Sequence, residues 1–171
     1  MKKFPALLFV LLLGIVSCSK NEVRHSEINV VNVSSLSFFK VASENSSPLS
    51  ASENNISFAF GDPVLTREGI AELNNFPCTK WIYKGATIYI QGGRLVDIDL
   101  MTSDYGLIVD GKLIRVGEDV STLKTIFPDS FAVKSPRQVF IGMHYNGEPI
   151  KSVILFDYNK QGKIITISLM D

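Results

Sequence analysis

The hydrophobic pattern divides the chain into an apolar start, a polar stretch and a longer region of short alternating segments. An unbroken apolar run extends from Phe4 to Val16, directly after two lysines. Ser and Asn dominate residues 42–55, where apolar side chains are few. Such a stretch buries too little apolar area to offset its ordering entropy, so we expect a flexible tether over residues 18–55. The β-branched and aromatic content of residues 28–41 leaves a strand open as an alternative there.

The globular domain is expected at residues 56–171, with two short helices. Asp62 or Thr66 suits the N-cap of the first helix, and Asp119 or Ser121 suits that of the second. Each helix is expected to end at a Phe-Pro pair, because proline disfavours helical geometry in the residue before it. Glycine turns, with Asp110-Gly111 as the clearest, separate runs of β-forming residues and predict antiparallel hairpins.

This order of elements occurs twice, over residues of about 58–115 and 116–171. Residues 93–101 match residues 162–170 at a constant offset of 69. One helix and a few strands bury little apolar area alone, so two copies are expected to share one core. We therefore predict an α+β fold with two short helices packed on an antiparallel β-sheet, built as a diverged tandem repeat of helix plus meander.

The residues before Cys18 predict where the protein resides. Ile15-Val16-Ser17-Cys18 resembles the lipobox of bacterial lipoproteins. That resemblance implies a signal peptide at residues 1–17, cleavage before Cys18, and acylation of its thiol and amino group. The apolar run is too short for a spanning helix and is typical of a signal peptide. The alternatives are cleavage at an ordinary site nearby or an uncleaved anchor.

Two further resemblances concern the membrane and the fold. Ser19 after the cysteine resembles the outer-membrane sorting pattern of lipoproteins, and the Lys/acidic stretch after it resembles surface-export signals of Bacteroidota lipoproteins. The periplasmic and cell-surface sides both stay open. The duplicated unit at residues 58–171 resembles envelope lipoproteins of the β-lactamase-inhibitor-protein-like type, which include accessory lipoproteins of outer-membrane β-barrel assembly. This resemblance implies the fold and a binding role, and assigns no functional residue.

Charge and cysteine content exclude several function classes. The signal peptide holds two lysines and no acid, which leaves 15 basic and 17 acidic residues afterwards. A nucleic-acid binder needs a basic face, so no nucleic-acid partner is expected. With Cys18 acylated, Cys78 is a single thiol that cannot form an internal disulfide.

The candidate chemical residues favour structural roles. Asp97 and Asp99 are expected on one solvated strand face, where no further ligand completes a metal site. His25 lies in the tether and His144 near a strand end, both without partners at ligand spacing. Cys78 is expected to be a buried packing residue rather than a reactive thiol. We therefore predict no catalytic residue, no metal site and no cofactor.

The aromatic residues on the expected strands offer the best binding candidates. Aromatic side chains build sheet cores, and they are also enriched at binding hot spots. Trp81 and Tyr83 share one strand face and form the candidate partner patch.

These observations lead to three hypotheses about function. The first is a non-enzymatic lipoprotein, anchored to the outer membrane by lipid on Cys18, that binds an envelope protein as an accessory module. The second is a surface-exposed lipoprotein that binds a small ligand or glycan. The third is an enzyme whose site is assembled from distant residues.

Overall fold

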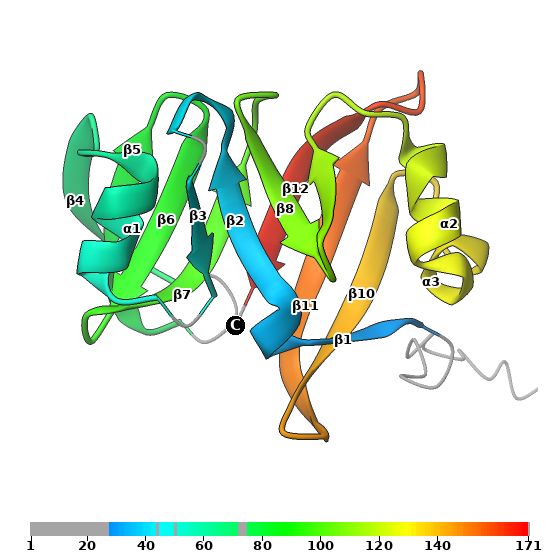
Figure 1. Cartoon of the computed structure of the whole chain (residues 1–171), viewed down its shortest axis with the longest axis horizontal. Coiled ribbons are helices and arrows are strands. Elements are labelled where there is room, and N and C mark those ends of the chain that lie inside the picture. Colours follow the sequence, from blue (N-terminus) through cyan, green and yellow to red (C-terminus); the bar gives the residue numbers. More distant parts are fainter. Residues whose placement is uncertain (1–27, 44, 50, 72–74, 171) are drawn as a thin grey trace, which may run out of the picture.

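The computed structural model describes residues 28–43, 45–49, 51–71 and 75–170, which form an α+β structure dominated by antiparallel strands. An eight-stranded sheet forms one layer, and a four-stranded sheet with short helices forms the other (Figure 1). The large sheet has the order β1 (Val30–Asn32), β10 (Gln138–Tyr145), β11 (Glu148–Tyr158), β12 (Ile164–Met170), β7 (Arg94–Leu100), β6 (Ala86–Gln91), β5 (Pro77–Tyr83) and β4 (Leu65–Ile70). The small sheet has the order β3 (Asn45–Pro48), β2 (Leu36–Lys40), β8 (Tyr105–Val109) and β9 (Lys112–Arg115).

The helices lie on the same side of the large sheet as the small sheet. Helix α1 (Glu53–Phe60) covers one half, and α2 (Leu123–Ile126) with α3 (Pro128–Ala132) covers the other (Figure 1). Short 3₁₀ turns complete the layer at η2 (Val33–Ser35), η3 (Val41–Ser43) and η4 (Val120–Thr122). Apolar faces of both layers meet in one core, in which the ring of Phe60 lies 5.8 Å from those of Tyr83 and Tyr105.

The hairpins predicted from turn residues are confirmed. Asp110 and Gly111 both adopt positive φ, 48° and 77°, as the tight turn between β8 and β9 requires. Turns at Gly85, at Gly92-Gly93 and at residues 159–162 join the other expected pairs. These turns depend on backbone conformations that glycine and aspartate favour locally, which is why the sequence predicts them.

The first predicted helix is wrong. Leu65–Ile70 forms strand β4, which pairs with β5 from Leu65 opposite Ile82 to Ile70 opposite Pro77. The first helix is instead α1, which lies earlier in the chain and ends at Gly61 with a φ of 77°. It buries Ile56, Ala59 and Phe60, so packing rather than the polar composition of this stretch decides its conformation.

The second predicted helix is present in divided form. The side chain of Asp119 accepts a hydrogen bond from the Ser121 amide at 2.9 Å, as a cap should. The turn η4 continues into α2, which ends at Phe127 as expected. Pro128 then begins α3, because proline at the first position of a helix sacrifices no hydrogen bond.

The predicted tether differs from the structure over residues 28–55, because the described part of this stretch belongs to the fold. Residues 28–41 contain β1 and β2, and β3 and the start of α1 follow. Leu36, Phe38 and Ala51 are each only 1% exposed. Their partners are distant in sequence, with β2 paired to β8 and β1 paired in parallel to β10. The start of the domain therefore lies well before residue 56.

Two strand contacts join the halves of the molecule. In the small sheet β2 pairs with β8, where Phe38 lies opposite Leu107. In the large sheet β7 pairs with β12 over three residues, where Asp99 lies opposite Ser168. We call the residue pairs Phe38–Leu107 and Asp99–Ser168 the central pairs. The two residues of each central pair are 69 positions apart in the sequence, which equals the offset of the sequence match.

Candidate interaction surface

In the predicted partner patch of Trp81 and Tyr83, the Tyr83 side chain faces the core. Tyr83 is 6% exposed and packs against Phe60, and its hydroxyl donates a hydrogen bond to the Gly61 carbonyl at 3.2 Å. Burial raises the pKa of this phenol above its usual range. Trp81 is partly buried against the same core. Strand aromatics therefore serve mainly packing here, as Tyr89, Phe156 and Tyr158 also do, whereas Tyr145 at the β10–β11 hairpin is 58% exposed.

The paired aspartates are structural. The predicted solvated face is wrong for Asp97, which is 2% exposed opposite Tyr89. Asp99 accepts hydrogen bonds from the Ser168 hydroxyl at 2.6 Å and from the Tyr89 hydroxyl at 3.0 Å. This carboxylate thus ties β7 to both of its neighbours, β12 and β6. Among the described residues, no three His, Cys, Asp or Glu side chains lie close enough to hold a metal ion.

The remaining chemical candidates do not converge on a site. Cys78 is 4% exposed and packs with Ala71 and Tyr89, so the prediction of a buried packing cysteine is confirmed. Burial raises the pKa of its thiol, an effect that the Lys80 charge partly opposes. His144 is part of β10, and its buried Nδ1 has no hydrogen-bond partner among the described atoms. Cys18 and His25 lie outside the described residues.

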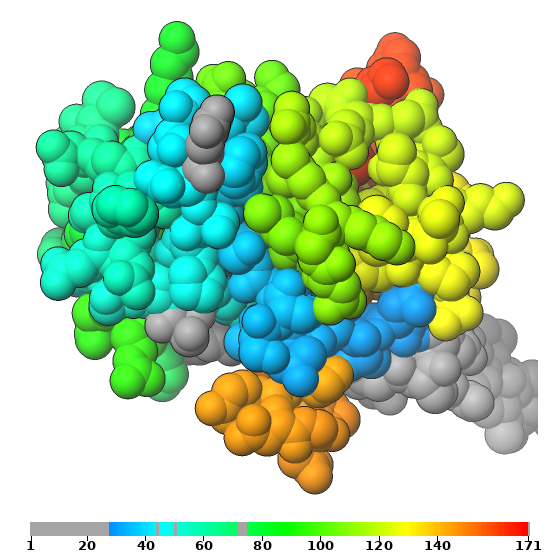
Figure 2. Space-filling view, viewed as in Figure 1, coloured from blue at the N-terminus to red at the C-terminus, as the bar shows by residue number. Residues whose placement is uncertain are grey.

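Exposed apolar side chains concentrate around strand β4. Ten large apolar residues are exposed in the described part of the chain, and five of them lie between residues 58 and 76. We call these five the β4 surface: Phe58 (74% exposed), Val64 (79%), Leu65 (52%), Ile70 (56%) and Phe76 (56%). The teal atoms of α1 and β4 form the left flank of the molecule in Figure 2. Half of the exposed large apolar residues thus lie on or next to α1 and β4, with Leu65 and Ile70 on opposite faces of β4.

Strand β4 is also the last strand of the large sheet and has one neighbour, β5. The Ala71 amide donates to the Phe76 carbonyl at 3.0 Å, and this pair continues the β4–β5 register. Hydrogen-bonded pairs alternate along an antiparallel ladder. The amide and carbonyl groups of Thr66, Glu68 and Ile70 therefore point away from β5. A free edge of this kind is a template for another strand.

A pocket of about 260 Å³ lies beside the start of β7 and the end of β12. Its lining is mostly apolar: Val33, Leu49, Leu95, Val96, Tyr145, Ile150, Ser152 and Leu169. Pockets for drug-sized ligands usually measure about 300–1,000 Å³. This pocket is therefore smaller than the usual site for a drug-sized ligand.

The sequence contained a weak signal for the β4 surface. The apolar residues of β4 stand at its two ends, with Arg67 and Glu68 between them, so they do not alternate with polar residues. This pattern fits an edge strand that is exposed on both faces. Such a segment matches neither a half-buried strand nor a clear amphipathic helix.

Within the described residues, no helix has both the length and the apolar character needed to cross a bilayer.

Comparison with known proteins identifies no family. No protein-family model matches the chain, and neither does any curated protein sequence. Among solved structures, the chain is similar to an extracellular protein containing an SCP domain from Bacillus anthracis str. Ames, with a TM-score of 0.40 and 10% sequence identity. The match covers 72% of this chain and 44% of that protein, so the chain spans less than half of its length. A similarity at this level assigns neither fold nor function.

Proposed function

We propose that this protein is a membrane-anchored envelope lipoprotein that acts as a non-enzymatic protein-binding or accessory module. The observation that carries the proposal is the β4 surface. Scattered exposed apolar residues are normal, whereas a concentration of them marks an interaction site. Phe58 and Phe76 are the aromatic anchors, a residue class enriched in the cores of protein interfaces.

The lipid anchor is the second part of the proposal. Acylation of Cys18 would hold the domain at the outer membrane, and two acyl chains give stable anchoring. Nine residues separate Cys18 from Ile28, and the ten residue steps between them span at most about 35 Å. The short connection would keep the domain close to the membrane, where it can meet an envelope protein. The resemblance to β-lactamase-inhibitor-protein-like lipoproteins belongs to the same proposal.

We further propose that the domain is a diverged tandem repeat whose copies begin earlier than residue 58. In the small sheet, β2 and β3 on one side of the centre correspond to β8 and β9 on the other side. In the large sheet, β7, β6 and β5 correspond in the same way to β12, β11 and β10. The central pairs, each 69 positions apart, support copies at about 36–100 and 105–169. Strand β4 has no counterpart in the second copy. The β4 surface is then an addition to the repeat, as expected for a functional elaboration.

Chemical cross-linking in intact envelopes, followed by purification of the protein, tests the binding role. We expect one envelope protein to be recovered with the wild-type chain and lost with the double variant Phe58→Ser and Phe76→Ser. Loss of a hot spot costs about 2 kcal/mol or more, which is a weakening of roughly 30-fold. The matched control is Tyr145→Ser, which removes an aromatic ring that is 58% exposed, close to the 56% of Phe76, from the β10–β11 hairpin. Equal recovery with all variants would contradict the proposal.

Fractionation of cells tests the anchor separately. Replacement of Cys18 by Ala should move the protein from the membrane fraction to the aqueous fraction. Unchanged membrane association would contradict anchoring through Cys18. Protease treatment of intact cells then distinguishes the sides, because a surface domain is digested and a periplasmic domain is protected until the outer membrane is permeabilised.

The pocket beside Tyr145 and Ile150 favours one alternative, binding of a small apolar ligand at the cell surface. The half-buried Trp81 is the single tryptophan and reports changes in the core. Quenching of its fluorescence by an apolar ligand would support this alternative. A flat response across a panel of apolar ligands and glycans would weaken it.

A further inference from the structure

We propose that the partner binds by adding an extended segment antiparallel to β4, with an acidic residue opposite Arg67 and a basic residue opposite Glu68. This inference rests on the proposed protein-binding function and specifies how the β4 surface is used. Strand addition obtains affinity from main-chain hydrogen bonds and specificity from the side chains opposite.

The backbone of β4 has the capacity for such an addition. Thr66, Glu68 and Ile70 direct their amide and carbonyl groups away from β5, which gives three donors and three acceptors in one row. All six residues of β4 are exposed except the partly exposed Gly69. No other described strand lies beside this edge (Figure 1). An antiparallel strand would continue the pattern of the adjoining strands, and antiparallel pairing is slightly more stable per residue than parallel pairing.

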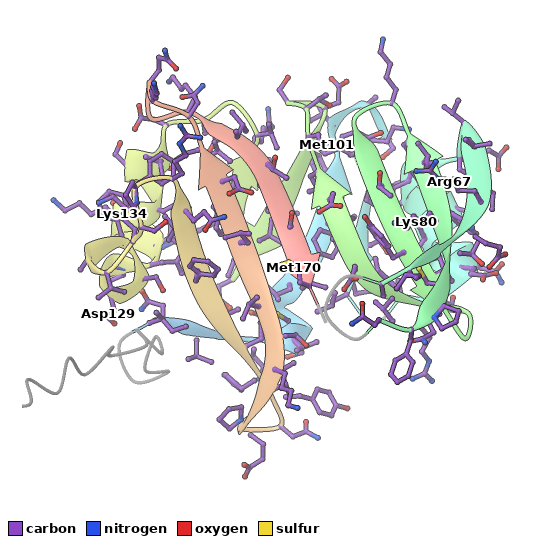
Figure 3. All side chains as sticks on the ribbon, turned by 180° about the vertical axis from the view of Figure 1, so that it is seen from behind. Arg67, Lys80, Met101, Asp129, Lys134 and Met170 are labelled. Atoms are coloured by element: carbon purple, nitrogen blue, oxygen red, sulfur yellow. The ribbon has the colours of Figure 1, made fainter. Side chains whose placement is uncertain are left out.

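The charges on β4 define the chemistry of the partner. Arg67 lies directly opposite Lys80 of β5, and both are labelled on the rear of the sheet in Figure 3. Like charges that lie directly opposite destabilise a strand pair. Among the described residues, no carboxylate lies within 4.0 Å of Arg67 in an ion pair. The methylenes of Lys80 lie over Gly69 of β4, and its ammonium is 4.5 Å from the centre of the Tyr89 ring. An acidic residue on the added strand would give Arg67 its missing partner.

A second copy of the same chain fits this edge poorly. When two copies of a strand pair around a two-fold axis in one continuous sheet, directly opposite residues must lie on the same face of the sheet. Because faces alternate along a strand, the numbers of two opposite residues must then add up to an even value. The two registers with the greatest overlap place Arg67 opposite its own copy or Glu68 opposite its own copy. Both put like charges in direct opposition, which disfavours self-association. The occupant is therefore a different chain with complementary charges.

The register predicts the order of residues in the partner. Read from its N-terminus, the added strand passes Ile70 first and Leu65 last, so the basic residue comes directly before the acidic one. Apolar residues belong at both ends, opposite Ile70 and Leu65. The six-residue pattern is thus apolar, any, basic, acidic, any, apolar.

Peptide binding to the purified protein, measured by fluorescence polarisation, tests this pattern. The probe is a labelled peptide with the core Val-Thr-Lys-Glu-Thr-Val, and its control has the core Val-Thr-Glu-Lys-Thr-Val, with identical composition. Two cross-strand pairs change from opposite to like charges, so the control should bind about tenfold more weakly. The double variant Arg67→Glu and Glu68→Arg should reverse this preference. Equal binding of both peptides, or no saturable binding up to about 1 mM, would overturn the inference.

Proline variants separate edge pairing from general damage to the fold. Glu68→Pro removes an outward amide, so it should abolish peptide binding while the melting temperature stays close to that of the wild type. Arg67→Pro is the matched control, because its amide points to β5 and its loss should destabilise the protein. If Glu68→Pro still captures the envelope protein that the Phe58→Ser and Phe76→Ser variant loses, strand addition is wrong and the binding module stands. If neither variant changes capture, the proposed function fails as well.

Discussion

Replacement of Phe38 by Ala tests whether the stretch before residue 56 is part of the fold. Phe38 is 1% exposed in β2, between Ser47 of β3 and Leu107 of β8. Removal of a fully buried phenylalanine ring costs about 3–5 kcal/mol, because transfer free energy is lost and a cavity remains. Small domains are stable by only about 5–15 kcal/mol. One substitution in this stretch should therefore remove a large part of the free energy of unfolding.

Urea unfolding followed by circular dichroism measures this loss. With an m-value of about 2 kcal/mol/M, a loss of 4 kcal/mol lowers the midpoint by about 2 M. The control is Phe58→Ala, the same chemical change at a residue that is 74% exposed, which should stay within about 0.5 kcal/mol of the wild type. A loss below about 1 kcal/mol for Phe38→Ala, or equal losses for both variants, would refute the placement of β2 in the core.

Three further outcomes follow from individual side chains. Ser168→Ala should lower the free energy of unfolding by about 1–2 kcal/mol, since Asp99 loses a charge-assisted hydrogen bond; an unchanged urea midpoint would contradict this. Cys78 should react slowly with a thiol reagent in the native state and rapidly in denaturant, because burial raises its pKa; equal rates would contradict it. Hydrogen bonds from Ser121, aided by Lys163, lower the pKa of Asp119. Its contribution to stability is therefore present above its ordinary pKa of 3.8 and is lost as the pH falls through the lower folded value. The stability difference between the wild type and Asp119→Asn should shrink accordingly in acid.

Local chemistry explains which parts of the fold the sequence predicts. Asp110-Gly111 specifies a tight turn without reference to any distant residue, and Asp119 specifies a cap through an amide two positions away. The general class also follows, because short β-forming runs between turn residues leave few options other than an antiparallel sheet.

Distant contacts explain what the sequence does not predict. Residues 45–48 are polar in composition, yet they form β3 because β2 offers them a paired edge. Residues 65–70 lack a clear period and become a strand because β5 lies beside them. For Tyr83, the sequence identifies the strand but not its buried face, since Tyr83 is buried by its contact with Phe60 of α1, which is distant in the sequence. The candidate surface was missed for the same reason: edge position is a property of the whole sheet.

Site-specific photo-cross-linking in intact envelopes tests the central claim most directly. A photoreactive residue at Thr66, on the free edge of β4, is compared with one at Lys160, on the turn between β11 and β12, which are separated from β4 by β7, β6 and β5. We predict one discrete adduct with an envelope protein at Thr66, none at Lys160, and loss of the adduct in the Phe58→Ser and Phe76→Ser background. No adduct at Thr66, or equal adducts at both positions, would contradict a binding role for β4.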